Sequence, residues 1–514
     1  MQDIKQWQEK IQNKRKQTPW RNYLMEITSW LSFTFYKNNN TISRYPSTNR
    51  IKIEDYNSFM KKREDLQKTW CDYDLQLSFF DNVIKFFKNF HHPNLIFYWT
   101  VENADFSDQS YNVENVYLSN TTIIDCSNVL YSFSVSTSSN VINSFYVKWS
   151  EVVHFSKWIQ KSYKIFYSAY IYDSNNIYFS DNLIGCNECI SCSHLENQKY
   201  CINNKQLPKD EYFKKKKDIL SNKKKFFYYY QWLDHKWQSY WNNGASWNYI
   251  LNSEHVENWL YVMYGKNQRN VWLTWWNTQN ENIFDTFSAG AAWGNDFYAV
   301  IAAGKSQNLY CSTLIVWSSN IYYSYYLENC SYCLGCIWLK NKSFCILNKQ
   351  YTKEERFEKA NEIFAQMEKD GDLGKFFPWS MNPFYFNDTV AYLIDDSFTK
   401  EEVEKEWYLR RDEAIKVDIP EWMDMVKTTE LNNYQWRKIN DKFYTLEQIW
   451  DKKLKEWIEM QRYIDPEILK KVIVDEKGNY YRIVKMEYDF LMKHALPLPE
   501  IHWLERIKLG FKFE

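Results

Sequence analysis

A twelve-residue repeat constrains the fold of this chain more than any other feature. From Asn128 the chain divides into blocks of twelve, and the second position carries Val129, Val141, Val153, Ile165, Ile177, Cys189 and Cys201. The eighth position carries branched aliphatic residues, and the fifth and eleventh carry Ser before changing to Cys. Such residues disfavour a helix, and a short fixed period indicates stacked coils. The pattern predicts a narrow β-solenoid with four inward side chains per coil.

The same register returns in the second half of the chain. Its second-position ladder is Val271, Ile283, Phe297, Leu309, Ile321, Cys333 and Cys345, with two extra residues placed at Gly294 and Asn295. Each coil can bury its inner face only against neighbours stacked at about 4.8 Å. We therefore expect a second solenoid of the same cross-section, too narrow to hold a ligand inside.

The fold class expected from these repeats is mainly β with helical segments: two narrow β-solenoids of about twelve residues per turn, each followed by a helix. The expected regions are an N-terminal helical and mixed part (1–95), the first solenoid with its four-cysteine unit (96–207), a helical connector rich in Lys and aromatic residues (208–250), the second solenoid with its four-cysteine unit (251–351), a helical part (352–460) and a small α+β C-terminal part (461–514).

Helix and turn signals lie mainly after the second repeat. Thr352 with Glu355 forms a capping box, and the helix that follows is expected to end at Gly371. Thr399 with Glu402 predicts another helix over TKEEVEKEWYLRRDE. Near the C-terminus, residues 477–479 predict the turn of a β-hairpin, which a short helix follows.

Eight of the 11 cysteines form two C-x2-C-x2-C-x8-C units. In the twelve-residue frame all of them fall at inward positions on adjacent coils, and they are Cys186, Cys189, Cys192, Cys201, Cys330, Cys333, Cys336 and Cys345. Four thiolates that converge in this way can hold zinc in a structural site. Two other interpretations fit the pattern: plain core cysteines with no metal, because a buried free Cys packs as a small apolar residue, and an iron–sulfur cluster.

The charge balance bears on partners and location. Lys plus Arg equals Asp plus Glu at 64 each, so no global field draws the protein to nucleic acid or membrane. No apolar run reaches the roughly 18 residues of a membrane span, and the free cysteines suit a reducing compartment. These observations predict a cytoplasmic protein that does not bind membranes. His154 and His194 are expected at the surface.

One local basic cluster stands out in the connector. It comprises Lys214, Lys215, Lys216, Lys217, Lys223, Lys224 and Lys225, followed by FFYYYQW. Interleaved lysines and aromatic residues are typical of surfaces that bind single-stranded nucleic acid. A solvated helix face is the favoured interpretation of this cluster.

Tryptophan and glycine contents are both unusual. The chain has 25 Trp and 11 Gly, which together make about 7% of the residues, the usual share of Gly alone. Trp149, Trp293, Trp338 and Trp379 stand in sequence contexts that favour Gly. This suggests the hypothesis that UGA codons specifying Gly were translated as Trp.

The unit from Cys330 to Glu355, C-x2-C-x2-C-I-x-L-x-N-K-x-x-C-I-x-N-K-Q-x-x-K-E-E, resembles a family of uncharacterised cysteine-rich repeat proteins of candidate-phylum bacteria, some of which use UGA for Gly. The resemblance covers roughly 95–514 and implies Gly at position 338. It also implies a zinc-ribbon-like C-terminal end around residues 496–499, but the cysteine pairs of such an end are absent here. The family implies no activity.

The function that these features favour is a non-enzymatic scaffold or protein-binding repeat protein with two structural zinc sites. A nucleic-acid-binding metalloprotein that uses the lysine cluster is the second hypothesis. A polysaccharide-active solenoid enzyme is the third, although no paired carboxylates or nucleophile motif stand out in the sequence.

Overall fold

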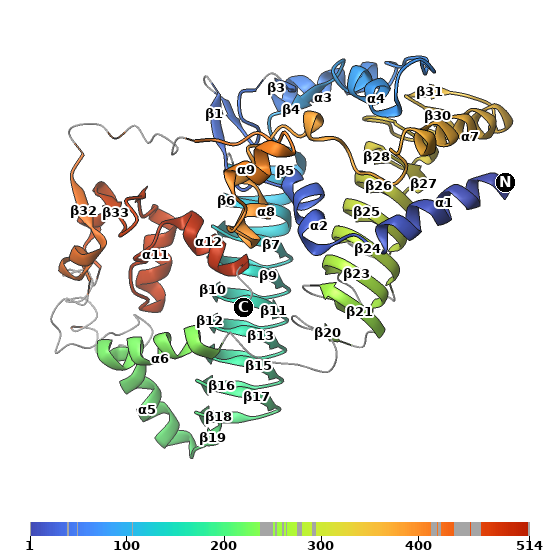
Figure 1. Cartoon of the computed structure of the whole chain (residues 1–514). Helices are drawn as coiled ribbons and strands as arrows, with labels where there is room; N and C mark the ends of the chain where they lie inside the picture. Colours follow the sequence, from blue (N-terminus) through green and yellow to red (C-terminus); the bar gives the residue numbers. More distant parts are fainter. Residues whose placement is uncertain are drawn as a thin grey trace. The chain divides into compact units, whose positions relative to one another are not determined.

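The computed structural model describes residues 2–38, 41–48, 50–104, 106–236, 250–251, 254–259, 262–263, 265–274, 280–289, 294–412, 419, 423–435, 453 and 464–511. The chain forms two compact units. The first-solenoid unit comprises Ile96–Ser239 and Glu413–Lys512, and the second-solenoid unit comprises Met1–Leu95 and Tyr240–Asp412. The predicted fold class is confirmed, because each unit is built on a β-solenoid with helices attached (Figure 1).

The first solenoid stacks its strands in parallel, one coil upon the next. Val129 pairs with Val141, and Val141 pairs with Val153, as the repeat predicts. These inward residues are 0% exposed and form one continuous core. The strands are β5 (Phe97–Glu102), β6 (Phe106–Leu130), β7 (Phe133–Ser136), β8 (Ser139–Ile142), β9 (Phe145–Lys148), β10 (Glu151–His154), β11 (Lys157–Gln160), β12 (Tyr163–Phe166), β13 (Ala169–Tyr172), β14 (Asn175–Tyr178), β15 (Asp181–Ile184), β16 (Asn187–Ile190), β17 (Ser193–Glu196), β18 (Lys199–Ile202) and β19 (Lys205–Gln206).

The corners of each coil have left-handed backbone. From Asn128 onward nearly every third residue has a positive φ, for example Tyr131 at 49°, Ser134 at 52° and Thr137 at 48°. Four corners therefore close each twelve-residue coil, and the residue after each corner points inward. Left-handed backbone is unfavourable for side chains other than Gly, Asn and Asp, so stacking must stabilise it.

Buried serines link successive coils. The Ser156 hydroxyl donates to the His154 carbonyl at 2.8 Å and accepts from the Ser168 N–H at 3.0 Å. The same two bonds repeat along the fifth and eleventh positions, so each inward Ser serves its own coil and the next one. This explains why Ser recurs at a buried position: its hydroxyl satisfies a backbone N–H that the β-pairing leaves free.

The second solenoid keeps the predicted register only from Ile283 onward, where Ile283 pairs with Phe297 and Phe297 with Leu309. Val271 was expected to stack on Ile283 but pairs with Thr286, because the coil that runs from Val271 to Thr286 is fifteen residues long and shifts the register. Its strands are β20 (Ile250–Leu251), β21 (Glu254–Trp259), β22 (Val262–Met263), β23 (Gly265–Thr274), β24 (Asn280–Ala289), β25 (Gly294–Gly304), β26 (Ser306–Val316), β27 (Ser319–Tyr322), β28 (Tyr325–Glu328), β29 (Ser331–Leu334), β30 (Cys345–Ile346) and β31 (Lys349–Gln350).

The two extra residues of this solenoid do not lie where the sequence placed them. Gly294 and Asn295 belong to β25 and pair with Ser306 and Gln307. Strands β24 and β25 stay in one register as far as the pair of Ala289 with Ala303. The two added residues therefore fall between Ala289 and Gly294, which lies outside the described residues.

Helices and two short sheets complete the second-solenoid unit. They are α1 (Gln2–Arg15), α2 (Trp20–Glu26), α3 (Tyr56–Leu66), α4 (Phe79–Phe87), α7 (Lys353–Lys369), α8 (Val390–Ile394) and α9 (Lys400–Lys405), with β1 (Tyr36–Asn38), β2 (Thr41–Ser43), β3 (Lys52–Glu54) and β4 (His91–Pro93). Both predicted capping boxes are confirmed. The helix predicted to run on from Thr399 is shorter than expected, because Trp407 turns left-handed after α9.

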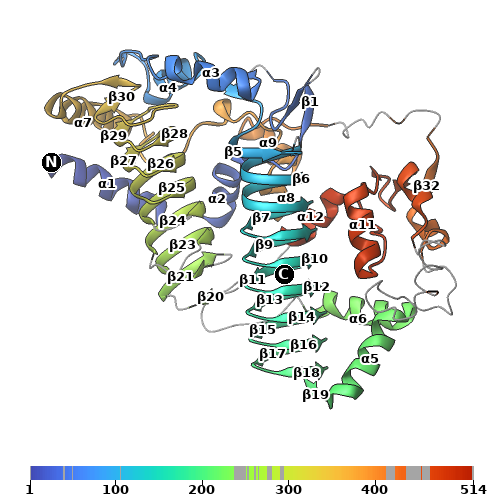
Figure 2. The same ribbon diagram turned by 180° about the vertical axis from the view of Figure 1, so that it is seen from behind.

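In the first-solenoid unit, α5 (Lys209–Ser221) and α6 (Lys223–Lys236) follow the last coil, and α11 (Lys485–His494) and α12 (Trp503–Phe511) lie beside the solenoid (Figure 2). The predicted hairpin forms between β33 (Val472–Val474) and β34 (Tyr480–Tyr481), and β32 (Met425–Lys427) extends it. His154 was expected at the surface and is 4% exposed, because Phe490 of α11 covers its ring at 5.6 Å.

Candidate functional site

The four cysteines of the first unit occupy the last two coils of the first solenoid. Cys189 in β16 pairs directly with Cys201 in β18, so their side chains enter the core one above the other. Cys186 and Cys192 directly follow the corners at Gly185 and Ser191, on either side of β16, and replace serines of the hydroxyl ladder. None of the four is more than 1% exposed. The repeat therefore brings the four predicted residues together at the end of the coil.

The cysteines of the second unit repeat this arrangement. Cys333 in β29 continues the apolar ladder from Ile321, and Cys345 lies in β30 on the following coil. Cys330 and Cys336 replace serines, as their counterparts in the first unit do. Their backbone N–H groups donate to the hydroxyls of Ser318 and Ser324, one coil earlier. All four are buried. The prediction that these eight residues form two inward groups agrees with their positions.

One thiol is central in each group, which we call the first and second quartets. Interaction with the neighbouring thiols of Cys186 and Cys192 raises the pKa of Cys189, and interaction with Cys330, Cys336 and Cys345 raises the pKa of Cys333. The hydrogen bond from Cys189 lowers the pKa of Cys186 to about 7, despite burial. Among the described residues, no set of three or more His, Cys, Asp or Glu side chains is arranged as a preformed metal site.

An asparagine closes each solenoid beyond the quartet. Asn204 accepts from the Ser193 N–H at 2.8 Å and donates to the Ser193 carbonyl at 2.9 Å, so its amide takes the place of a further strand. Asn348 does the same at Ile337, at 2.9 and 2.8 Å. The backbone N–H of Asn204 also donates to the Cys192 sulfur at 3.4 Å. Each quartet is thus enclosed between the last coil and its cap.

The donor set of each quartet suits a soft divalent ion. Four sulfur atoms with no oxygen or nitrogen ligand match the tetrathiolate sites that zinc prefers. A ZnS4 tetrahedron with zinc–sulfur bonds of about 2.3 Å has sulfur–sulfur edges of about 3.8 Å. An iron–sulfur cube would require the four sulfurs to be wider apart.

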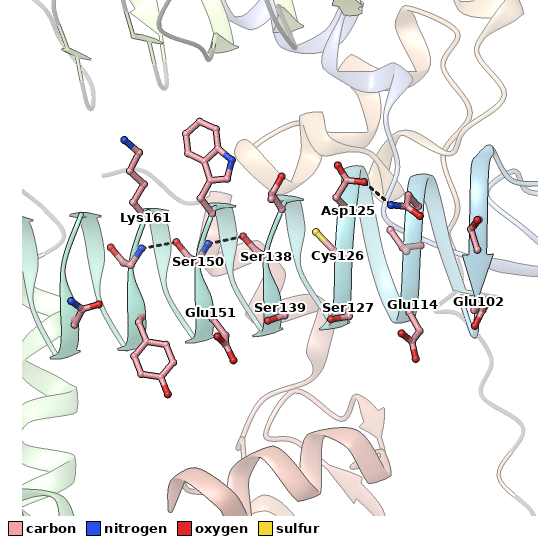
Figure 3. A pocket seen from close by; sticks show the side chains of 18 residues that line it. Glu102, Glu114, Asp125, Cys126, Ser127, Ser138, Ser139, Ser150, Glu151 and Lys161 are labelled. Carbon is pink, nitrogen blue, oxygen red and sulfur yellow. Dashed lines mark hydrogen bonds between the residues drawn. The ribbon is translucent and has the colours of Figure 1, made fainter.

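A groove of about 920 Å³ runs along the outside of the first solenoid. Figure 3 shows its floor of small residues, including Ser138 and Ser150, between two rows of longer side chains. One row carries Asp125 and Lys161 at coil corners, and the other carries Glu102, Glu114 and Glu151, which lie in strands β5, β6 and β10. The sequence repeat drew attention to inward positions, so these outward carboxylates were not predicted, although their spacing near twelve is visible in the chain.

The lysines of the connector are dispersed over two helices. Lys216 is 8% exposed and forms an ion pair with Glu188 at 2.5 Å. Lys215 and Lys225 pair with Glu211 and Asp218. Lys214, Lys217 and Lys224 are exposed, and Lys223 donates to Asn432 at 2.6 Å. The role of this cluster in nucleic-acid binding stays a prediction.

Comparison of the chain with protein-family models, curated proteins and solved structures finds no match. Among the described residues, no helix combines the length and apolar character needed to cross a membrane.

Proposed function

We propose that this protein is a scaffold: two β-solenoids, each closed by a structural four-cysteine zinc centre, that offer an outer groove to a protein partner. The observation that carries the proposal is the recurrence of the same quartet, at the same inward positions and under the same asparagine cap, at the end of both solenoids.

Core packing alone does not explain why the inward aliphatic residues and the inward serines both change to Cys in the same coils. Ile177 and Ser180 occupy the same positions as Cys189 and Cys192, one coil earlier. They show that an aliphatic residue and a hydroxyl serve these positions well. A thiol is a weaker hydrogen-bond partner than a hydroxyl and fills less space than Ile. Replacing both kinds of residue in the final coils loses packing and hydrogen bonding, which a bound ion with four sulfur ligands would outweigh.

A structural role follows from the burial of the quartets. A catalytic zinc site keeps an open position for water or substrate, whereas four buried thiolates would leave none. The end of a solenoid is also where stabilisation is needed, because the terminal coil has a stacking partner on one side only. Zinc would thus fix the last coil and the helix that follows it.

The groove of the first solenoid supports a binding role. Its carboxylates, Glu102, Glu114, Asp125 and Glu151, face one lysine, Lys161, so its field favours a partner segment rich in Lys or Arg. We expect synthetic Lys-rich peptides to bind more weakly when Glu114 and Glu151 are changed to Gln, measured by fluorescence anisotropy. A matched double change outside the groove, Glu368→Gln with Glu406→Gln, should leave binding unchanged. Equal affinities in all variants would show that the groove does not bind the peptide.

Metal analysis of the purified full-length protein tests the zinc centres. We expect two equivalents of zinc, with one lost in Cys189→Ser and the other lost in Cys333→Ser. Cys126→Ser is the matched control, because Cys126 is a buried cysteine of the same solenoid that lies outside both quartets. Protein that is free of zinc, iron and other transition metals after expression in zinc-supplemented medium would overturn the proposal.

A further inference from the structure

Arg356 is a buried cation that has no anionic partner among the described residues. It is the fourth residue of α7, its side chain is 0% exposed, and none of its three guanidinium nitrogens has a hydrogen-bond partner. Of the other arginines that are buried, Arg15 pairs with Glu26 at 2.6 Å and Arg506 pairs with Glu487 at 2.6 Å. A buried charge without a counterion is strongly unfavourable, so Arg356 indicates a missing negative charge.

The second quartet can supply that charge. The Arg356 guanidinium interacts electrostatically with the sulfurs of Cys333, Cys336 and Cys345. Its other neighbours are the rings of Tyr322 and Phe357, whose centroids lie 5.7 and 5.3 Å from it. Aromatic faces stabilise a guanidinium only weakly compared with an anion. Four neutral thiols would leave the cation unbalanced.

The first quartet has a different environment at the matching positions. The two units are offset by 144 residues, so Tyr212 corresponds to Arg356, and the ion pair of Glu188 with Lys216 corresponds to Tyr332 and Ala360. At these matched positions the charges of the first unit therefore cancel. In the second unit the same positions hold the single charge of Arg356.

The second quartet is also the more deeply enclosed of the two. Leu347 is 0% exposed and Trp338 is 2% exposed, whereas their counterparts Asn203 and His194 are exposed. Helix α4 covers this side, and a Cβ on Gly335 would lie 3.5 Å from Val83. A metal bound by four thiolates carries a net charge of about −2, which is costlier to bury where water is excluded. A balancing cation is therefore needed at the second quartet more than at the first.

We propose that the second quartet binds a divalent soft cation as an anionic tetrathiolate centre and that Arg356 is the positioning residue which balances its charge. The proposal rests on the zinc sites proposed above and makes the two centres unequal. On binding, the four thiols release their protons to solvent, the ion replaces them, and no electron is transferred. Arg356 then gains the anion that it lacks in the metal-free state.

Competition titration of the full-length protein with a chromophoric chelator tests this role, with Zn²⁺ for affinity and Co²⁺ for the thiolate absorption bands. Arg356→Met, which keeps the length and loses the charge, should weaken the second site about tenfold or more. Arg356→Lys should restore most of the affinity because it keeps the charge. Tyr212→Phe is the matched control, and it should leave both sites unchanged.

The outcomes separate the two proposals. If the wild type binds two ions and the Arg356→Met variant binds both as tightly, the role of Arg356 is overturned. The proposal of two zinc sites then still holds. Equal weakening by Met and Lys also overturns it, because the role would then be packing. Wild-type protein that binds no metal overturns both. Circular dichroism of each variant monitors folding, and Arg356→Gln provides a second neutral variant if the Met variant does not fold.

Discussion

Gly371 and Trp407 occupy the same place beyond two helices of the second-solenoid unit. Gly371 follows α7 with φ of 73°, and Trp407 follows α9 with φ of 60°. In both, two successive backbone N–H groups donate to carbonyls of the last helical turn. Gly is suited to this left-handed position and Trp is not, since its Cβ crowds the neighbouring backbone. With 66% of its surface exposed, Trp407 recovers little of this strain through burial.

Replacing Trp407 with Gly should therefore stabilise the second-solenoid unit by about 1 kcal/mol, against the usual trend for substitution by Gly. Chemical denaturation of the full chain measures the change. Trp407→Ala is the control, because it removes the same ring and keeps the left-handed strain. Equal stabilities of the Gly and Ala variants would show that the backbone at this position is not strained.

The hypothesis that UGA specifies Gly in this gene makes a related prediction. Trp149, Trp317 and Trp338 also have left-handed backbone, with φ of 50°, 51° and 57°, but they lie at solenoid corners that accept many residue types. Trp407 is thus the more telling position. We expect a UGA codon at 407 and Gly in peptides of the protein from its natural source, detected by mass spectrometry. Trp379 does not have positive φ, and Trp293 lies outside the described residues.

The solenoids could be predicted because their inward residues repeat without exception over several coils. Val129, Val141 and Val153 reveal the period, and stacking follows from the need to bury them. The left-handed corners could not be predicted in the same way. Tyr131 and Lys161 stand at corners although neither residue favours such a backbone, so the fold imposes the conformation against local preference.

The sequence also located the eight cysteines but not what surrounds them. Arg356 follows a capping box on a charged helix, a setting typical of solvent-exposed arginine, and it is buried only because α7 packs on the last coil. His154 was placed at the surface wrongly for a similar reason, since Phe490 covers it from more than 300 residues away. Contacts of this kind leave no periodic signal in the chain.

Burial of His154 should make the first-solenoid unit sensitive to mild acid. Burial lowers the pKa of His154 from 6.5 to about 3, so the folded state holds the neutral ring. The unfolded state takes up a proton as the pH falls below 6.5, and stability is lost progressively between about pH 6.5 and 3. At pH 5 the loss should approach about 2 kcal/mol.

Thermal unfolding at pH 7 and pH 5 checks this expectation. His154→Phe should unfold at more similar temperatures at the two pH values than the wild type does, because Phe can pack against Tyr167 and Phe490 without titrating. The exposed His194 provides the control, and His194→Gln should keep the wild-type difference. An undiminished pH effect in His154→Phe would contradict the prediction.

The asparagine caps should hold the final coils in place. Asn204→Ala removes both amide hydrogen bonds to Ser193, which should raise the hydrogen-exchange rate of the Ser193 amide by about tenfold, for a local loss of about 1 to 2 kcal/mol. The neighbouring Asn203 is also exposed and left-handed, so Asn203→Ala is a matched control. If both variants exchange alike, the cap does not stabilise the coil.

The serine ladder allows the most direct test of how the coils are held together. Ser156→Ala leaves the Ser168 N–H without its acceptor inside the solenoid, where no water replaces it. An unsatisfied buried donor costs about 1 to 3 kcal/mol, and we expect chemical denaturation of the first-solenoid unit to show a loss in that range. Ser134 is equally buried, but its hydroxyl has no hydrogen-bond partner, so Ser134→Ala should change stability by less than about 0.5 kcal/mol. Because the two variants remove the same atom from the same solenoid, their difference isolates the ladder bond; equal losses would mean that packing, and not the hydroxyl, maintains Ser at the inward positions.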